Sequence, residues 1–230
     1  MARPLLICVY SRAFAIKISI LFRFMKTTIY LIRHGQTEWN VERRMQGRTD
    51  SPLTALGLDA TKKLAVDFPK VGKIYCSPIG RTVHTANILF GEQTIVCDDR
   101  LREIDLGDWE GRLQADLDRE DPEMHFNFWN APHRYQKEGA ESFSQVADRA
   151  AECFMELAER HAGETIAVVS HTTVIRSILF SIEPRDLAEF WNPPAIYPAS
   201  VSEVEILDGV PRIVRFGCTA HHEHDHSGAY

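Results

Sequence analysis

The stretch TTIYLIRHGQTEWN, residues 27–40, changes within one residue from an apolar run to a group of polar and small residues. An apolar run as short as 29–32 is typical of a buried strand. Arg33, His34 and Gly35 follow it directly. A strand end and a turn glycine would account for Gly35, whereas a chemical role for His34 would require a second histidine and further positive charge elsewhere in the chain. The stretch therefore predicts a buried strand whose carboxyl end is a candidate site.

Apolar runs of strand length recur along the chain, at residues 73–76, 94–97, 165–169, 201–206 and 212–216. Segments of helical length separate several of them. Two of these segments, 53–68 and 141–163, have apolar residues at helical spacing, and Gly163 suits the C-terminal cap of the second. Alternating strands and helices predict an α/β protein, a three-layer α/β/α sandwich with a mostly parallel central sheet. The last two runs flank LDGVP and predict a hairpin at the sheet edge.

Residues 108–140 fit this alternation poorly, because they are rich in charged and aromatic residues and contain two prolines. We expect a cap-like insertion over one end of the sheet, of the kind that gates a site and selects its substrate. Its aromatic residues serve either to contact a substrate or to anchor the insertion on the core, and the sequence leaves both open. The residues concerned are Phe126, Phe128, Trp129 and Tyr135.

The two ends of the chain differ in composition from the single domain expected between them, residues 26–218. Residues 1–26 contain five basic residues and no acidic one. An extension at 1–25 is interpreted as a targeting or surface segment, a signal sequence, or untranslated sequence before a start at Met25. The third is favoured because MKTTIYLIRHG begins as a compact domain would. Residues 219–230 form a His-rich tail, which we expect to be solvated rather than a metal site.

The overall composition narrows the partners and the compartment. The net charge of −6 leaves no basic excess to neutralise nucleic-acid phosphates, although a few local arginines could hold a small phosphorylated ligand. No run of ~20 apolar residues is free enough of charge to span a membrane. The five cysteines are widely scattered and form no CxxC pair, which favours a reduced, cytoplasmic protein.

A second histidine occupies the same kind of position as His34. The run AVVS at 167–170 leads directly into His171, just as the first apolar run leads into Arg33 and His34. In open α/β sheets, ligands bind in the crevice beyond the carboxyl ends of the strands. We therefore expect the two histidines to face each other there.

Two further segments could supply charge to that crevice. In SPIGRTVHTA, residues 77–86, Ser77 suits the N-cap of a helix and Pro78 its first position. Arg81 would then lie in the first turn, where the helix dipole favours an oxyanion or a phosphate. LREIDLGDWEG, residues 101–111, has four acidic residues, any of which could act as general acid and base, and spacing alone does not choose among them.

The four motifs together resemble those of the histidine phosphatase superfamily, the phosphoglycerate-mutase-like proteins. LIRHGQTEWN, SPIGRTVHTA, LREIDLGDWEG and VVSHTTVIR are similar to that family's motifs and stand in its order. The similarity extends over nearly the whole chain, from about residue 26 to residue 216. The resemblance implies a phosphoglycerate-mutase-like fold, with the insertion over the active site.

The resemblance also implies roles for individual residues. His34 would be the nucleophile that forms a phosphohistidine, and Glu103 the acid that protonates the leaving oxygen and then activates water. The residues that cradle the phosphoryl oxygens would be Arg33, Arg81 and His171, in keeping with the directed hydrogen bonds of guanidinium groups. The residues that line the phosphate or substrate side would be Asn40, Gln46, Gly47 and Thr172. Many relatives have glycine at the position of Thr172, so we expect a slightly narrower pocket and a shifted substrate preference.

The expected activity is metal-independent hydrolysis of a small phosphorylated metabolite, with no cofactor and no metal. LREIDLGDWEG resembles the phosphatase branch, which includes the alpha-ribazole phosphatases and broad-specificity phosphatases. A cofactor-dependent phosphoglycerate mutase is the alternative, and a non-catalytic phospho-ligand binding protein is a weaker one. We expect neither nucleic acid nor membrane as a partner. The sequence leaves open both a homodimer and the identity of the substrate.

Overall fold

The apolar run of the opening stretch lies at the centre of a six-stranded sheet. In the computed structural model, which describes residues 25–222, the strand order is β3-β2-β4-β1-β5-β6. The strands are β1 (Lys26–Arg33), β2 (Lys73–Cys76), β3 (Ile95–Cys97), β4 (Thr165–Ser170), β5 (Val201–Leu207) and β6 (Val210–Cys218). The first four are mutually parallel, and β5 runs antiparallel to both of its neighbours. The predicted mostly parallel sheet is therefore confirmed.

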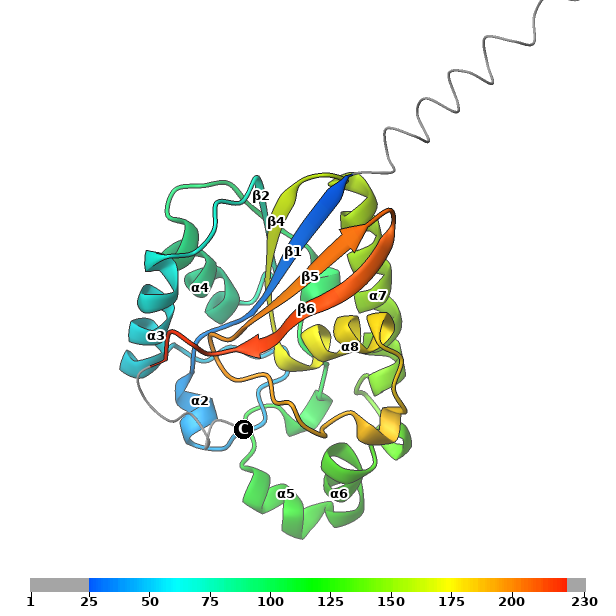
Figure 1. Ribbon diagram of the computed structural model, residues 1–230. Coiled ribbons are helices and arrows are strands. Elements are labelled where there is room, and N and C mark those ends of the chain that lie inside the picture. Colours follow the sequence, from blue (N-terminus) through cyan, green and yellow to red (C-terminus); the bar gives the residue numbers. More distant parts are fainter. Residues whose placement is uncertain (1–24, 223–230) are drawn as a thin grey trace, which may run out of the picture.

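Helices cover both faces of this sheet, as Figure 1 shows. Helices α7 (Phe143–Arg160) and α8 (Thr172–Ile182) pack on one face, and α3 (Ala55–Val66) and α4 (Gly80–Phe90) on the other. Because side chains alternate along a strand, Ile29 and Leu31 belong to the α7–α8 side and Ile32 to the α3–α4 side. This explains why the run is apolar throughout, and the predicted three-layer sandwich is confirmed.

The edge hairpin has the turn that its sequence predicts. Leu207 pairs with Val210, so only Asp208 and Gly209 lie between β5 and β6. Both have positive φ, 53° and 78°, as the primed turns of tight hairpins require. Leu207 also pairs with Lys26 at the start of β1, so this turn lies at the end of the sheet opposite His34.

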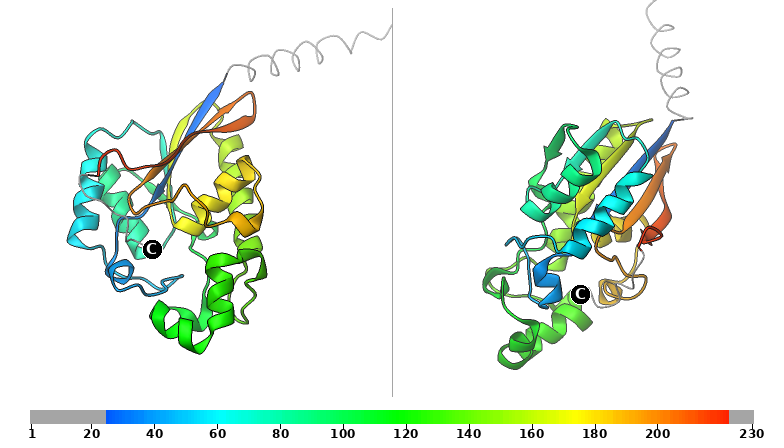
Figure 2. Two further views of the ribbon diagram at one scale, coloured as in Figure 1. Left: turned by 60° about the horizontal axis from the view of Figure 1, so that its bottom comes forward. Right: turned by 90° about the vertical axis from the view of Figure 1, so that its left-hand side faces the viewer.

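Residues 108–140 lie beyond the carboxyl ends of the strands. They form α5 (Gln114–Glu120), α6 (Pro122–Asn130) and a short 3-10 helix, η3 (Pro132–Arg134). In Figure 1 and in both views of Figure 2 these green helices lie beyond the same end of the sheet. The remaining short elements are α2 (Glu38–Val41), η1 (Asp99–Leu101), η2 (Gly107–Trp109) and η4 (Leu187–Glu189).

Two predicted helix ends are wrong. Helix α4 begins at Gly80, and its N-cap is Ile79, which provides no side-chain hydrogen bond. The carboxylate of Asp50 accepts the N–H of Arg81, in the first turn of the helix, at 3.0 Å. Helix α7 ends at Arg160 with His161 as its C-cap, and Gly163, φ 84°, lies two residues later in the turn.

The described residues end close to the expected domain limits. Residues 1–24 and 223–230 are outside them, so the N-terminal extension and most of the His-rich tail stay predictions. Among residues 25–222, no helix is both long and apolar enough to cross a membrane.

Candidate active site

The two histidines meet because β1 and β4 are adjacent and parallel. Arg33 pairs with Ser170 at the last position of both strands. The next residue of each strand is a histidine, and the His34 N–H donates to the Ser170 carbonyl at 3.1 Å. Their imidazole rings lie edge to face, with centroids 5.2 Å apart. The juxtaposition expected from two isolated motifs is thus present in the structure.

His34 has the tautomer that a nucleophile needs. Its Nδ1 lies 2.7 Å from the Gly35 carbonyl oxygen, which can only accept, so Nδ1 carries the proton and Nε2 keeps a lone pair. The side chain is only 3% exposed. Burial and the positive charges of Arg81 and Arg33 hold the pKa of His34 well below its ordinary value of 6.5. His34 is therefore neutral at physiological pH.

Arg81 connects His34 to the loop that follows α2. Its Nε donates toward His34 Nε2 at 3.3 Å, and its two terminal nitrogens donate to the carbonyls of Gly47 and Thr49, both at 2.7 Å. Burial lowers its pKa to about 10, although the nearby carboxylate of Glu103 opposes the shift. Arg81 is therefore a charged, oriented donor next to His34.

The imidazole of His171 is held by a hydrogen bond to Ser77. Its Nε2 lies 2.8 Å from Ser77 Oγ, and that oxygen also accepts the Ile79 N–H at 3.4 Å. The hydroxyl proton can then point to Nε2, which leaves the proton of His171 on Nδ1. This Nδ1 is buried and has no hydrogen-bond partner among residues 25–222. Burial, followed by the charge of Arg81, lowers the pKa of His171 well below 6.5, so this ring is neutral too.

The four acids of LREIDLGDWEG have different environments. Asp105 pairs with Arg48 at 3.1 Å and Asp108 with Lys137 at 2.9 Å, while Glu110 accepts two backbone N–H groups of residues 48 and 49. Glu103 alone of the four lines the cavity that contains His34. Its Oε1 accepts the N–H of Ile104 at 2.9 Å. The tertiary structure therefore distinguishes one acid that the spacing could not.

A cavity of about 80 Å³ unites most of the predicted residues. Eight of the nine line it, namely Arg33, His34, Asn40, Gln46, Gly47, Arg81, Glu103 and Thr172. The ninth, His171, is completely buried and contacts the ring of His34 edge to face. Arg33 is oriented by a hydrogen bond of 2.7 Å to the Ile196 carbonyl, and Asn40 by accepting the Thr37 N–H at 3.0 Å.

The aromatic residues of the insertion are divided between the two roles that the sequence left open. Trp129 and Phe128 line the cavity, and Phe128 also belongs to the core. Tyr135 is buried in the core away from the cavity, and Phe126 is 60% exposed. Trp191 also lines the cavity and was not predicted, because nothing in its neighbourhood of the sequence marks it as functional.

The site differs from a larger cavity elsewhere in the described chain, and it is not a cluster of metal-binding side chains. A larger cavity of about 560 Å³ lies near Met25 and Phe154 and is lined by no histidine or arginine. Within residues 25–222, no group of three or more His, Cys, Asp or Glu side chains is arranged to hold a metal ion. The cavity beside His34 is small but contains a neutral imidazole, buried guanidinium groups and one carboxylate, which suits phosphoryl transfer.

Known proteins of similar sequence and structure include phosphatases that act on phosphate esters. Residues 29–219 match the model of the histidine phosphatase superfamily, branch 1. The solved structure of YhfR from Bacillus stearothermophilus is 40% identical, with a TM-score of 0.82 over 85% of this chain and 98% of that one. Phosphoserine phosphatase 1 of Hydrogenobacter thermophilus is 33% identical over 71% of this chain and 80% of its own length. A probable phosphoglycerate mutase of Salmonella paratyphi C is 34% identical over 67% and 74%.

Proposed function

The chain belongs to the histidine phosphatase superfamily, and we propose that His34 carries the phosphoryl group while a small phosphomonoester is hydrolysed. The observation that carries this proposal is the state of His34, a buried neutral imidazole whose Nε2 lone pair faces Arg81. Phosphoryl transfer requires mainly positioning and charge stabilisation, and both are present around that atom.

The first step transfers the phosphoryl group to the protein. Nε2 of His34 forms a bond to phosphorus as the bond from phosphorus to the ester oxygen breaks. Glu103 in its acid form gives its proton to that oxygen, so the product leaves as a neutral alcohol. Arg33 and Arg81 donate to the phosphoryl oxygens, and His171 offers its Nδ1–H, which has no other partner in the described chain.

The second step returns the protein to its starting state. The Glu103 carboxylate accepts a proton from water as the water oxygen attacks phosphorus. The bond between phosphorus and Nε2 then breaks, its electron pair returns to Nε2, and inorganic phosphate leaves. Glu103 thus ends the cycle protonated, ready for the next ester.

The body of the substrate would contact aromatic faces. The indole N–H of Trp129 donates to His125 Nε2 at 3.1 Å, and that of Trp191 to the Phe128 carbonyl at 2.6 Å. Since both donors are already used within the protein, what these side chains offer to the cavity is mainly apolar surface. We infer a preference for phosphomonoesters with an apolar or planar body, acted on in the cytoplasm.

The test is phosphate release in EDTA from a panel of small phosphomonoesters, with His34→Ala beside the wild type. We expect metal-independent release that the variant lacks, and a ³²P label on wild-type His34 after acid-free quenching. A parallel reaction holds 3-phosphoglycerate with bisphosphoglycerate. Isomerisation faster than phosphate release would replace hydrolysis by mutase activity, and phosphoester binding without any turnover would make the protein a binding protein.

A further inference from the structure

Glu103 stands on a segment with little regular structure, and the guanidinium of Arg149 on α7 holds that segment. Arg149 Nη1 donates to the carbonyls of Arg100 and Arg102 at 2.7 and 2.6 Å, and Nη2 to the carbonyl of Glu103 itself at 3.2 Å. One side chain therefore binds three carbonyls within four residues. The last of the three belongs to the residue proposed as the general acid.

The remaining carbonyl of this segment is also bound by a side chain. Ser170, the last residue of β4, donates through Oγ to the Leu101 carbonyl at 2.8 Å. All four carbonyls from 100 to 103 thus accept hydrogen bonds from side chains of α7 or β4. Because His171 directly follows Ser170, the segment with the acid and the strand with the second histidine are joined at this point.

Glu141 orients Arg149 for this contact. Its two carboxylate oxygens accept from Nε and Nη2 of Arg149, both at 2.9 Å, in a bidentate pair. The same carboxylate accepts the Asp105 N–H at 3.0 Å, and the Glu141 N–H donates to the Asp105 carbonyl at 2.9 Å. Arg149 and Glu141 thus hold the chain on both sides of Glu103, at residues 100–103 and at 105.

This pair differs from an ordinary surface ion pair. The side chains of Arg149 and Glu141 are only 16% and 19% exposed. Both also bind backbone groups of the segment that contains Glu103. Burial acts to raise the pKa of Glu141, but hydrogen bonds from Arg149 and Asp105 outweigh it and lower the pKa. Arg149 does not line the cavity, so any effect on the reaction must act through the backbone that it holds.

We propose that Arg149, oriented by Glu141, is a positioning residue that aims Glu103 at the leaving oxygen. The proposal rests on the proposed function, in which Glu103 is the general acid. Arg149 and Glu141 would thus contribute to catalysis as well as to the stability of the fold. A displaced carboxyl would still leave His34 and Arg81 in place, so the loss should fall on the proton transfer alone.

Esters with different leaving groups separate this role from a general loss of structure. Expulsion of an alkyl alcohol needs a proton, whereas p-nitrophenolate leaves without one. The ratio kcat/KM includes only the steps up to departure of the leaving group, so it is insensitive to the later activation of water. A misplaced Glu103 should therefore lower kcat/KM for an alkyl phosphate and spare it for p-nitrophenyl phosphate.

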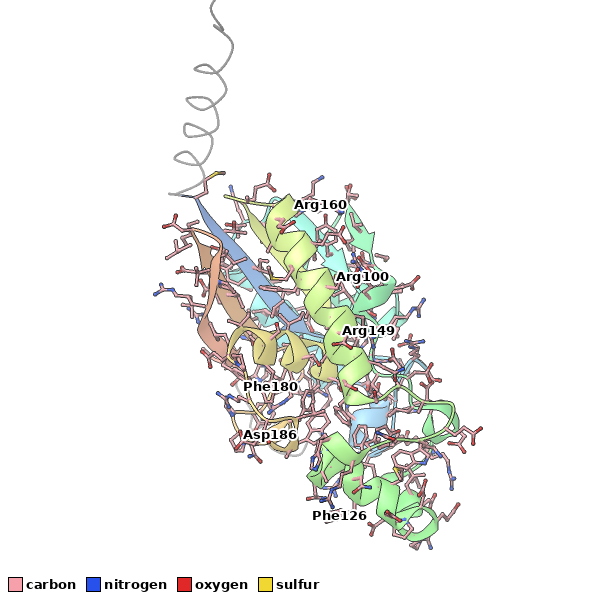
Figure 3. All side chains as sticks on the ribbon, turned by 90° about the vertical axis from the view of Figure 1, so that its right-hand side faces the viewer. Arg100, Phe126, Arg149, Arg160, Phe180 and Asp186 are labelled. Carbon is pink, nitrogen blue, oxygen red and sulfur yellow. The ribbon has the colours of Figure 1, made fainter. Side chains whose placement is uncertain are left out.

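The variant Arg149→Lys keeps the charge but cannot reach three carbonyls at once. We expect kcat/KM for an alkyl phosphate to fall by about 10- to 100-fold, and that for p-nitrophenyl phosphate by less than about threefold. Arg160→Lys is the matched control. Arg160 lies on the same helix, nearer its end (Figure 3), and pairs with Glu156, so this variant should behave as wild type on both esters.

A double-mutant cycle provides the second readout. In a Glu103→Gln background, adding Arg149→Lys should cost little on the alkyl ester, because the group that it positions is already absent. Glu141→Gln keeps a neutral acceptor and should show a smaller loss with the same dependence on the leaving group. It also serves if Arg149→Lys fails to fold, as judged by circular dichroism.

The outcomes are distinguishable. A wild type that releases no phosphate from any ester would overturn the proposed function itself. Equal losses on the two esters, or full additivity with Glu103→Gln, would overturn the positioning role while leaving the phosphatase intact. A loss of kcat/KM that is confined to the alkyl ester and is not additive with Glu103→Gln would establish the positioning role.

Discussion

The two buried histidines should make the stability of the protein depend on pH well above the range where carboxylates titrate. His34 and His171 are 3% and 0% exposed, and burial, with the charge of Arg81, holds both pKa values well below 6.5. In the unfolded chain each histidine regains its ordinary pKa. Below about pH 6.5 the unfolded chain therefore binds protons that the folded chain does not. The contribution to stability is complete above that pH and is lost as the pH falls toward the folded-state pKa values.

The size of the effect follows from the number of protons. Each histidine that stays neutral when folded and charges when unfolded contributes a slope of up to ~1.4 kcal/mol per pH unit. Two give up to ~2.7 kcal/mol per pH unit, a large part of a typical folding free energy. Asp98 and Glu141 also have lowered pKa values, but their ordinary values are 3.8 and 4.5, so their stabilisation is lost only at lower pH. Between pH 6.5 and 5, the pH dependence of stability therefore reports on the histidines rather than on these two carboxylates.

Urea unfolding followed by tryptophan fluorescence would measure this slope between pH 7.5 and 5. Phosphate buffer must be avoided, because an anion bound to the folded site would stabilise it. We expect His34→Gln and His171→Gln each to flatten the slope by up to ~1.4 kcal/mol per pH unit. His133→Gln, an exposed histidine outside the site, is the control and should keep the wild-type slope.

Wild-type slopes in both His34→Gln and His171→Gln would show that the two rings titrate alike in the folded and unfolded chains, contrary to the expected effect of burial. The same result would undermine the neutral nucleophile, which requires that His34 resist protonation. If only His133→Gln flattened the slope, the pH dependence would come from His133 and not from His34 or His171. Either finding would be independent of any assumption about the substrate.

Three further perturbations should act on separate parts of the molecule. Arg81→Lys keeps the charge but loses two of the three directed hydrogen bonds, so kcat/KM for p-nitrophenyl phosphate should fall by about 10²- to 10³-fold; a loss under tenfold would contradict its role. Trp191→Ala removes the hydrogen bond to Phe128 and one aromatic face of the cavity, and should raise KM more for naphthyl than for methyl phosphate; equal changes would argue against apolar recognition. Gly209→Ala places a side chain at φ 78° and should cost about 1 kcal/mol in urea unfolding, with kcat/KM unchanged, because the turn is at the end of the sheet opposite His34.

Much of the fold could be predicted because its determinants are local. The apolar runs place all six strands to within a few residues, and Asp208–Gly209 marks the hairpin turn through its own backbone preference. The position of His34 and His171 directly after two parallel strands was enough to predict that they meet. Resemblance to a known family added Glu103, which local pattern alone could not distinguish from its three acidic neighbours.

The helix ends were predicted less well, because their capping groups come from elsewhere in the chain. Ser77 has the chemistry of an N-cap, but in the folded protein its hydroxyl contacts His171, 94 residues away. The carboxylate of Asp50, 31 residues earlier in the chain, accepts the N–H of Arg81 in the first turn of the helix. A capping residue is recognised from the sequence only when it lies next to the helix that it caps.

The layered sheet, the paired histidines and the positive charge beside them could be predicted from the amino-acid sequence, since strand periodicity and turn preference are properties of short segments. Three features depend instead on the folded chain: which acid lines the cavity, the position of Trp191 beside it, and the hydrogen bonds of Arg149 to the segment with Glu103. Each of these depends on hydrogen bonds or packing between residues far apart in the chain. Such contacts exist only after the sheet and its helices have brought those residues together.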